Sequence, residues 1–165
     1  MTHASLRVAN LLGAVVVALG DQLPVSADDA ALVSLSWNDG LSVDGLADVV
    51  GLSQPGTVRL IDRLADAGLV RRGQGADGRT RALHLSAKGR RRAERVLADR
   101  EVLLADTLGA VRADEARLLE TTLSRILARL TVDESTAYRI CRLCDEAACG
   151  PGVECPVERA LGLAP

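Results

Sequence analysis

The fold is decided by residues 52–72, which read LSQPGTVRLIDRLADAGLVRR. Ser53 is a favourable N-cap, and Pro55 stands in the first helical turn, where its missing N–H breaks no hydrogen bond. Gly68 follows the last apolar residue, the usual place for a glycine that ends a helix. These signals predict a helix from Ser53 to about Ala67. Its expected apolar face is Val58, Ile61, Leu64 and Ala65, and its expected outer face is Gln54, Thr57, Arg59 and Arg63.

Two short helices are expected before this one. Ser26 and two acids precede an apolar helix over residues 30–35, and Trp37 is expected to fill the core behind it. The turn signal Asn-Asp-Gly at 38–40 follows, and Ser42 then begins a helix over residues 43–50. Further upstream, residues 8–20 show the apolar spacing of a helix that packs on other helices.

On the other side, residues 69–72 and 81–85 are two extended segments around a tip rich in Gly and Asp, which predicts a two-stranded hairpin. Ser86 begins a long helix to about residue 108, and further helices follow from about residue 113 to 130 and from residue 133. This order predicts a mainly α winged helix-turn-helix with long N- and C-terminal dimerisation helices. The expected division is a dimerisation helix (1–25), a DNA-binding lobe (26–86), long helices completing the dimer (87–132) and a cysteine-bearing tail (133–165).

The segments 52–64 and 67–72, the Asp77-Gly78-Arg79 tip and the stretch 83–89 resemble the recognition helix, wing and following strand of MarR-type transcription regulators. The resemblance is close over about residues 27–107. It implies a homodimer on a palindromic operator and a small-ligand cleft whose residues the sequence does not assign. It also implies that four side chains enter the major groove: Ser53, Gln54, Thr57 and Arg59. By the same resemblance Arg63 lies along a phosphate edge, and Arg79, oriented by Asp77, reaches the minor groove.

The charge distribution supports DNA binding independently of the resemblance. Residues 54–99 contain eleven Arg or Lys and five acids, a local charge of +6 within a chain of net charge −2. Phosphate binding requires such local positive charge whatever the average of the protein. We expect Gln54 and Arg59 to read base edges, and Arg63, Arg79 and Arg81 to contact backbone or groove shape.

Other classes of protein are disfavoured. With one Trp, one Tyr and no Phe, the chain lacks the aromatic platform of single-strand binders. The apolar stretch at residues 8–20 is preceded by only one basic residue, Arg7, which is weak for a signal peptide. It is also interpreted as too short to span a bilayer. Both points predict a cytoplasmic protein without a membrane partner. No catalytic constellation is evident, so we expect no enzyme.

All four cysteines lie near the C-terminus, with the spacing C-x2-C-x4-C-x5-C at Cys141, Cys144, Cys149 and Cys155. Four thiolates suit a tetrahedral Zn²⁺, of which we expect one per chain, or an iron–sulfur cluster. Reversible disulfides and unligated thiols remain open alternatives. Such a metal could be a structural clasp for the tail or a sensor that changes the separation of the recognition helices.

The leading hypothesis is therefore a homodimeric, sequence-specific DNA-binding regulator, most simply a repressor, with a metal or redox site in its tail. Two alternatives use the Cys141-x-x-Cys144 motif: a thiol oxidoreductase, and a metal-binding interaction module without DNA contact. A thioredoxin-like enzyme would place the motif in a βαβ unit, which the sequence does not show.

Overall fold

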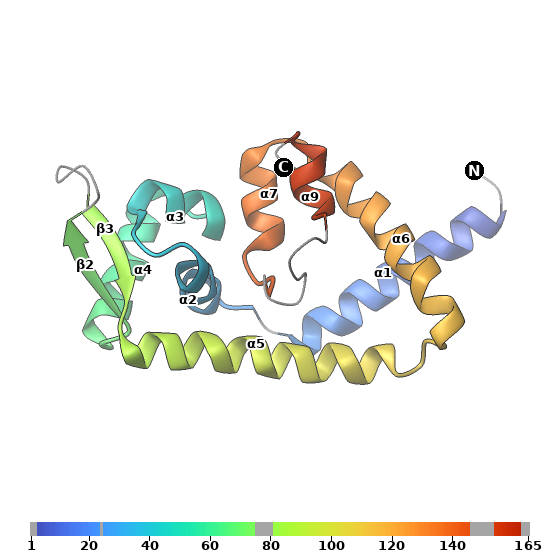
Figure 1. The fold of residues 1–165 in the computed structure, drawn as a ribbon, viewed down its shortest axis with the longest axis horizontal. Helices are drawn as coiled ribbons and strands as arrows, with labels where there is room; N and C mark the ends of the chain where they lie inside the picture. Colours follow the sequence, from blue (N-terminus) through green and yellow to red (C-terminus); the bar gives the residue numbers. More distant parts are fainter. Residues whose placement is uncertain (1–2, 24, 75–80, 146–153, 163–165) are drawn as a thin grey trace.

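A computed structural model of the chain describes residues 3–23, 25–74, 81–145 and 154–162. In chain order its elements are α1 (His3–Gln22), α2 (Ala27–Trp37), β1 (Leu41–Ser42), α3 (Val43–Val50), α4 (Gln54–Asp66), β2 (Val70–Gln74), β3 (Arg81–Leu85), α5 (Ala87–Leu108), α6 (Ala113–Leu130), α7 (Glu134–Cys141) and α9 (Pro156–Ala160). The predicted winged helix-turn-helix with long flanking helices is confirmed (Figure 1).

Serine side chains begin four of the helices, as the sequence predicted. The hydroxyl oxygens of Ser26, Ser42, Ser53 and Ser86 accept hydrogen bonds from backbone N–H groups three residues onward. Gly51 and Gly68 follow α3 and α4 with φ of 68°, a left-handed conformation that favours glycine. The boundaries of the DNA-binding lobe therefore follow from local chemistry.

The sheet has three antiparallel strands rather than the two of the predicted hairpin, in the order β1-β3-β2. Gly40, with φ of 85°, donates its N–H to the Leu83 carbonyl oxygen at 3.0 Å, and Leu41 pairs with Leu83. The turn at 38–40 thus adds a short strand to the wing before Ser42 begins α3.

The core of the DNA-binding lobe lies between α2, α3, α4, the sheet and the start of α5. Its fully buried side chains include Leu32, Leu35, Leu46, Leu60 and Leu83. Trp37 is not the predicted core residue, because it ends α2 at the surface and is 37% exposed. The smaller side chains of α2 fill the core instead.

Helix α1 extends away from this lobe and makes no extensive contact with any other described helix or strand (Figure 1). Its large apolar side chains are exposed, among them Leu11 at 53% and Val15 at 49%. The helix is longer than the predicted segment 8–20. By length and composition Ala4–Gln22 could cross a membrane, so the prediction that this stretch is too short to do so is wrong.

Candidate DNA-binding surface

Helix α4 has one face in the core and one in solvent. The buried face consists of Thr57, Leu60, Ile61 and Leu64, at helical positions i, i+3, i+4 and i+7. The prediction that Thr57 enters the major groove is therefore wrong: its side chain is fully buried, and its hydroxyl donates to the Ser53 carbonyl oxygen at 3.1 Å. That internal hydrogen bond satisfies the hydroxyl and lets a threonine occupy a core position.

Val58, and not Thr57, is exposed on the outer face of α4. It was predicted to be in the core, but it is 39% exposed beside Arg59 on the outer face of α4. An exposed valine on a recognition helix suits contact with the methyl group of thymine. The helical spacing of Thr57, Leu60, Ile61 and Leu64 would have predicted this buried face if a threonine had been accepted at a core position.

Three other residues predicted to lie on the outer face are exposed: Ser53, which is the N-cap of α4, and Gln54 and Arg59 within the helix. The Gln54 side-chain amide donates to Asp44 of α3 at 2.9 Å, which holds the start of α4 against the preceding helix. Arg59 makes no ion pair within the described part of the chain, so its guanidinium is available for a base edge or a phosphate.

Arg63 lies on the side of α4 that faces α2. Its guanidinium is 2.8 Å from the Asp28 carboxylate, with the two side chains 60% and 37% exposed. A phosphate contact by Arg63 would require this pair to open. Because an exposed pair is worth about 0–1 kcal/mol, a DNA phosphate could compete for the arginine.

The wing is joined to α4 by a second ion pair, between Arg72 of β2 and Asp62 of α4 at 2.6 Å. Arg81 is exposed and is the first residue of β3. The predicted minor-groove residue Arg79 and its partner Asp77 lie outside the described residues. The structure therefore brings an exposed α4 face and the basic strands of the wing to one side of the lobe.

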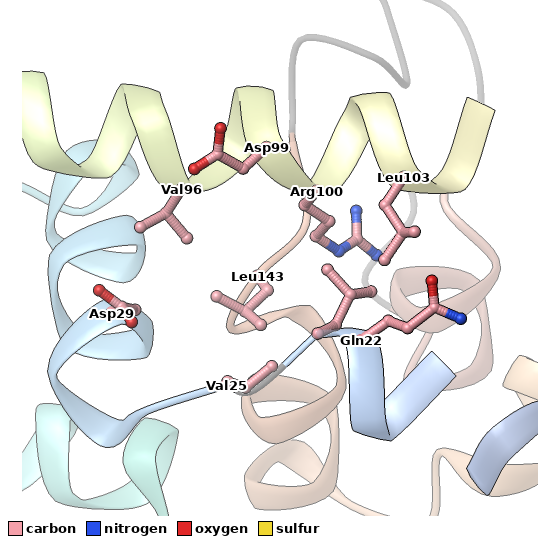
Figure 2. Close-up of a pocket in the computed structure, with 9 residues that line it drawn as sticks. Gln22, Val25, Asp29, Val96, Asp99, Arg100, Leu103 and Leu143 are labelled. Atoms are coloured by element: carbon pink, nitrogen blue, oxygen red, sulfur yellow. The ribbon is translucent and has the colours of Figure 1, made fainter. Parts of the chain in front are cut away.

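A cavity of about 490 Å³ lies between the lobe and the long helices, a feature that the sequence did not assign to residues. Figure 2 shows its side chains converging from α5, from α2, from the end of α1 with the following segment, and from the segment after α7. They are Gln22, Leu23, Val25, Asp29, Val96, Asp99, Arg100, Leu103 and Leu143. An apolar wall with a few polar groups is typical of a small-molecule site.

Three of the four cysteines lie within the described residues. Cys141 ends α7, Cys144 donates its backbone N–H to the Cys141 carbonyl oxygen at 2.8 Å, and Cys155 is the N-cap of α9. No disulfide joins these three, and Cys149 lies outside the described residues. The hydrogen bond with Cys144, and then burial, raise the pKa of the Cys141 thiol.

Electrostatic repulsion from the Cys144 and Cys155 thiols also raises the pKa of Cys141. Within the described ranges, no three His, Cys, Asp or Glu side chains are already arranged as metal ligands. Thiolates are ligands that zinc accepts, but the three described cysteines do not form a metal site by themselves.

Residues 30–80, which begin within α2 and extend past the end of β2, match the MarR family. The chain carries a MarR-family domain. Members of this family regulate transcription and are not enzymes, so the oxidoreductase alternative is not supported. Among curated proteins, none matches the sequence.

The structure is similar to that of a MarR family protein from Bacillus stearothermophilus, at 25% identity and a TM-score of 0.67, over 79% of this chain and 99% of that chain. A MarR family transcriptional regulator from Silicibacter pomeroyi matches at 26% identity and a TM-score of 0.54, over 80% of this chain and 92% of that one. The PcaV transcriptional regulator from Streptomyces coelicolor, in complex with its natural ligand, shares the fold at 23% identity and a TM-score of 0.51, over 76% of this chain and 92% of that one. The first two matches leave 21% and 20% of this chain uncovered.

Proposed function

We propose that the protein is a homodimeric repressor that inserts α4 of each protomer into the major groove of a palindromic operator. The observation that carries this proposal is the outer face of α4, where Gln54, Val58 and Arg59 are exposed beside the wing while the opposite face anchors the helix in the core. Polar, apolar and cationic side chains on one helix face can discriminate base pairs in the major groove. The MarR-family match over residues 30–80 supports the same function.

Dimerisation is supported by the exposed apolar side chains of the long helices. Leu11 and Val15 of α1, Val102 of α5 and Leu118 of α6 are between 49% and 71% exposed. Apolar surface of this extent is unfavourable in water and marks an interaction site. A second copy of the chain would cover it and would present two recognition helices at once.

The 490 Å³ cavity is the proposed effector site. It joins the DNA-binding lobe, through Asp29, to α5, through Arg100 and Leu103. Arg100 makes no ion pair within the described part of the chain and extends into the cavity in Figure 2. The ligand class that fits is a small molecule with an apolar body and a polar end, and PcaV, of the same fold, is described with a natural ligand.

The four cysteines, Cys141, Cys144, Cys149 and Cys155, are the proposed ligands of one Zn²⁺ per chain, with an iron–sulfur cluster as the alternative. The contact between the Cys141 and Cys144 thiols supports this proposal. A metal would hold a tail whose helices are eight and five residues long, too short to persist alone in water. Elemental analysis and the absorption spectrum of anaerobically purified protein separate zinc from a coloured iron–sulfur cluster, and either from disulfides.

The test of DNA binding begins with selection of a high-affinity duplex from a random pool by the full-length protein. Fluorescence anisotropy then compares wild type with Arg59→Ala, and with the control Arg125→Ala on exposed α6. We expect Arg59→Ala to lose about 1–3 kcal/mol on the selected duplex, and Arg125→Ala to bind like wild type.

Failure to select any sequence, or equal losses for the two variants, would refute the proposed DNA contact. Light scattering tests the dimer, for which the expected mass is twice 17.3 kDa. A monomer, or a protein recovered only with membranes through α1, would refute the proposed assembly. Run-off transcription from the natural promoter, reduced by added protein, tests the repressor assignment.

A further inference from the structure

Helix α5 borders two separate cavities with two different faces. The face at Val96, Arg100 and Leu103 borders the 490 Å³ cavity. A second cavity, of about 370 Å³, borders the residues at spacing i, i+4, i+7, i+8 and i+11 of the same helix, namely Arg90, Glu94, Leu97, Ala98 and Glu101. Because residues three, four and seven apart share one side of a helix, each set is a single stripe, and the two stripes share no residue. The second cavity is therefore a site of its own.

The other walls of this second cavity come from α2 and from the C-terminal tail. Helix α2 packs on α5 (Figure 1), and its last residue, Trp37, lines the cavity and is 37% exposed. The segment after α7 contributes Asp145. That segment is held on the lobe, because the Ser34 hydroxyl donates to the Arg142 carbonyl oxygen at 3.4 Å and Leu143 packs against the buried core. A part of the chain beyond the residues that match the MarR family therefore completes the cavity.

The lining of the second cavity carries a negative charge. Its ionisable groups are the carboxylates of Glu94, Glu101 and Asp145 and the guanidinium of Arg90, which together give a net charge of −2. Within the described part of the chain, Glu94 and Glu101 make no ion pair. Leu97 lies between these two glutamates on α5 and gives the cavity an apolar patch. A concave surface with an excess of one charge attracts ligands of the opposite charge.

A small aromatic cation fits this lining better than a metal ion does. Ca²⁺ and Mg²⁺ require several oxygen ligands that converge on one point. Within the described ranges, no three His, Cys, Asp or Glu side chains are arranged in that way. Trp37 and Leu97 instead offer apolar contacts, and an indole ring attracts a cation placed over its face. A volume of about 370 Å³ is in the range of small-molecule pockets.

We propose that this cavity binds a small aromatic cation, with the ring against Trp37 and Leu97 and the positive charge close to Glu94 and Glu101. The delocalised charge of such a cation is more weakly hydrated than that of an ammonium group, which lowers the cost of entering a partly apolar cavity. The site depends on neither DNA nor zinc binding, and it is distinct from the proposed effector cavity.

The experiment uses the full-length protein and the probe N-methylquinolinium, a flat bicyclic cation. Quinaldine, a bicyclic of nearly the same size that is uncharged in mildly alkaline buffer, is the matched neutral probe. Equilibrium dialysis measures the dissociation constant of each probe, and quenching of Trp37, the only tryptophan in the chain, reports where the cation binds. The variants are Glu94→Gln, Glu101→Gln and Trp37→Leu, and the control for net charge is Glu120→Gln, at an exposed position of α6 outside this cavity. Circular dichroism checks that each variant is folded.

We expect saturable binding of one N-methylquinolinium per chain with saturable quenching of Trp37, and binding of quinaldine that is at least about tenfold weaker. Glu94→Gln and Glu101→Gln should each raise the dissociation constant at least about threefold, which is the effect of one nearby charge at a solvent-exposed site. Trp37→Leu should raise it at least about twofold, and Glu120→Gln should bind like wild type.

No saturable binding of N-methylquinolinium, or equal affinity for quinaldine, would refute the proposal. Binding that is unchanged in both Glu94→Gln and Glu101→Gln would also refute it, because the cation would then occupy another site. The two glutamate variants replace exposed side chains, so the test does not depend on the folding of Trp37→Leu. DNA binding is measured separately, so its failure and the failure of this site are distinguishable.

Discussion

Gly89, in the first turn of α5, offers the sharpest test of the packing that connects the lobe to the long helices. A Cβ at this position would lie 2.1 Å from the Leu69 carbonyl oxygen, 3.0 Å from the Leu69 carbonyl carbon and 3.2 Å from Cδ2 of Leu85. Real Cβ atoms essentially never come closer than 3.0 Å to another atom, so Gly89→Ala must separate α5 from the Leu69 backbone by about 0.9 Å.

The energetic consequence can be estimated from the contacts at this position. Separation would break the hydrogen bond from the Ser86 N–H to the Leu69 carbonyl oxygen, which is 2.9 Å long. Overpacking costs about 1–3 kcal/mol and a lost hydrogen bond about 1 kcal/mol, while alanine gains about 1 kcal/mol over glycine in a helix. We expect Gly89→Ala to lose about 2 kcal/mol, equivalent to roughly 4–8 °C in Tm for a chain of this size.

The assay is thermal unfolding followed by circular dichroism at one protein concentration, because dimerisation makes Tm depend on concentration. The control is Gly20→Ala in α1, where an added Cβ has no neighbour within 4 Å and only the helix-propensity gain applies. Gly20→Ala should be as stable as wild type or more stable. A Gly89→Ala protein as stable as Gly20→Ala would contradict the close approach of α5 to Leu69.

Three other predictions concern the recognition helix and the tail. Gln54→Ala should weaken binding to the selected duplex by about 1–3 kcal/mol but leave binding to a scrambled duplex nearly unchanged, as measured by anisotropy; equal losses on both would remove Gln54 from base readout. Leu60→Ala, at a fully buried side chain, should cost about 2–5 kcal/mol in denaturant unfolding, and a loss below that of a surface substitution would contradict the assigned core face. Asp133 caps α7, and hydrogen bonds from Thr136 hold its pKa below the ordinary value of 3.8. The Asp133 carboxylate therefore stabilises the folded protein above pH 3.8, and this stabilisation is lost as the pH falls through the lower pKa of the folded state. Acid titration of Trp37 emission should therefore show a transition below about pH 4 that Asp133→Asn lacks, and identical titrations would exclude this role.

Local chemistry in the sequence was enough to predict the helix starts and the wing. A capping serine needs only the N–H groups of its own helix, and Gly68 needs only its own positive φ. The order of these elements, together with the basic charge of residues 54–99, gave the fold and the DNA-binding surface.

Features that depend on distant partners were not predictable in the same way. Helix α4 is rotated so that Thr57 is buried and Val58 is exposed, which is possible because the Thr57 hydroxyl donates to the Ser53 carbonyl oxygen. Sorting residues into apolar and polar classes does not predict such a buried threonine. The pairing of Arg63 with Asp28 and the docking of Leu143 on the lobe join residues far apart in the chain. The cysteine spacing indicated a common site for the thiols but gave no information about the surfaces to which the tail attaches.

The central claim is that two copies of α4 enter successive major grooves on one face of a DNA duplex. Hydroxyl-radical footprinting of the full-length protein on its selected duplex tests this claim most directly. We predict two equivalent protected half-sites related by a dyad and centred about 34 Å apart, one turn of the double helix. A single protected stretch without symmetry, or uniform protection at every sequence, would contradict the account.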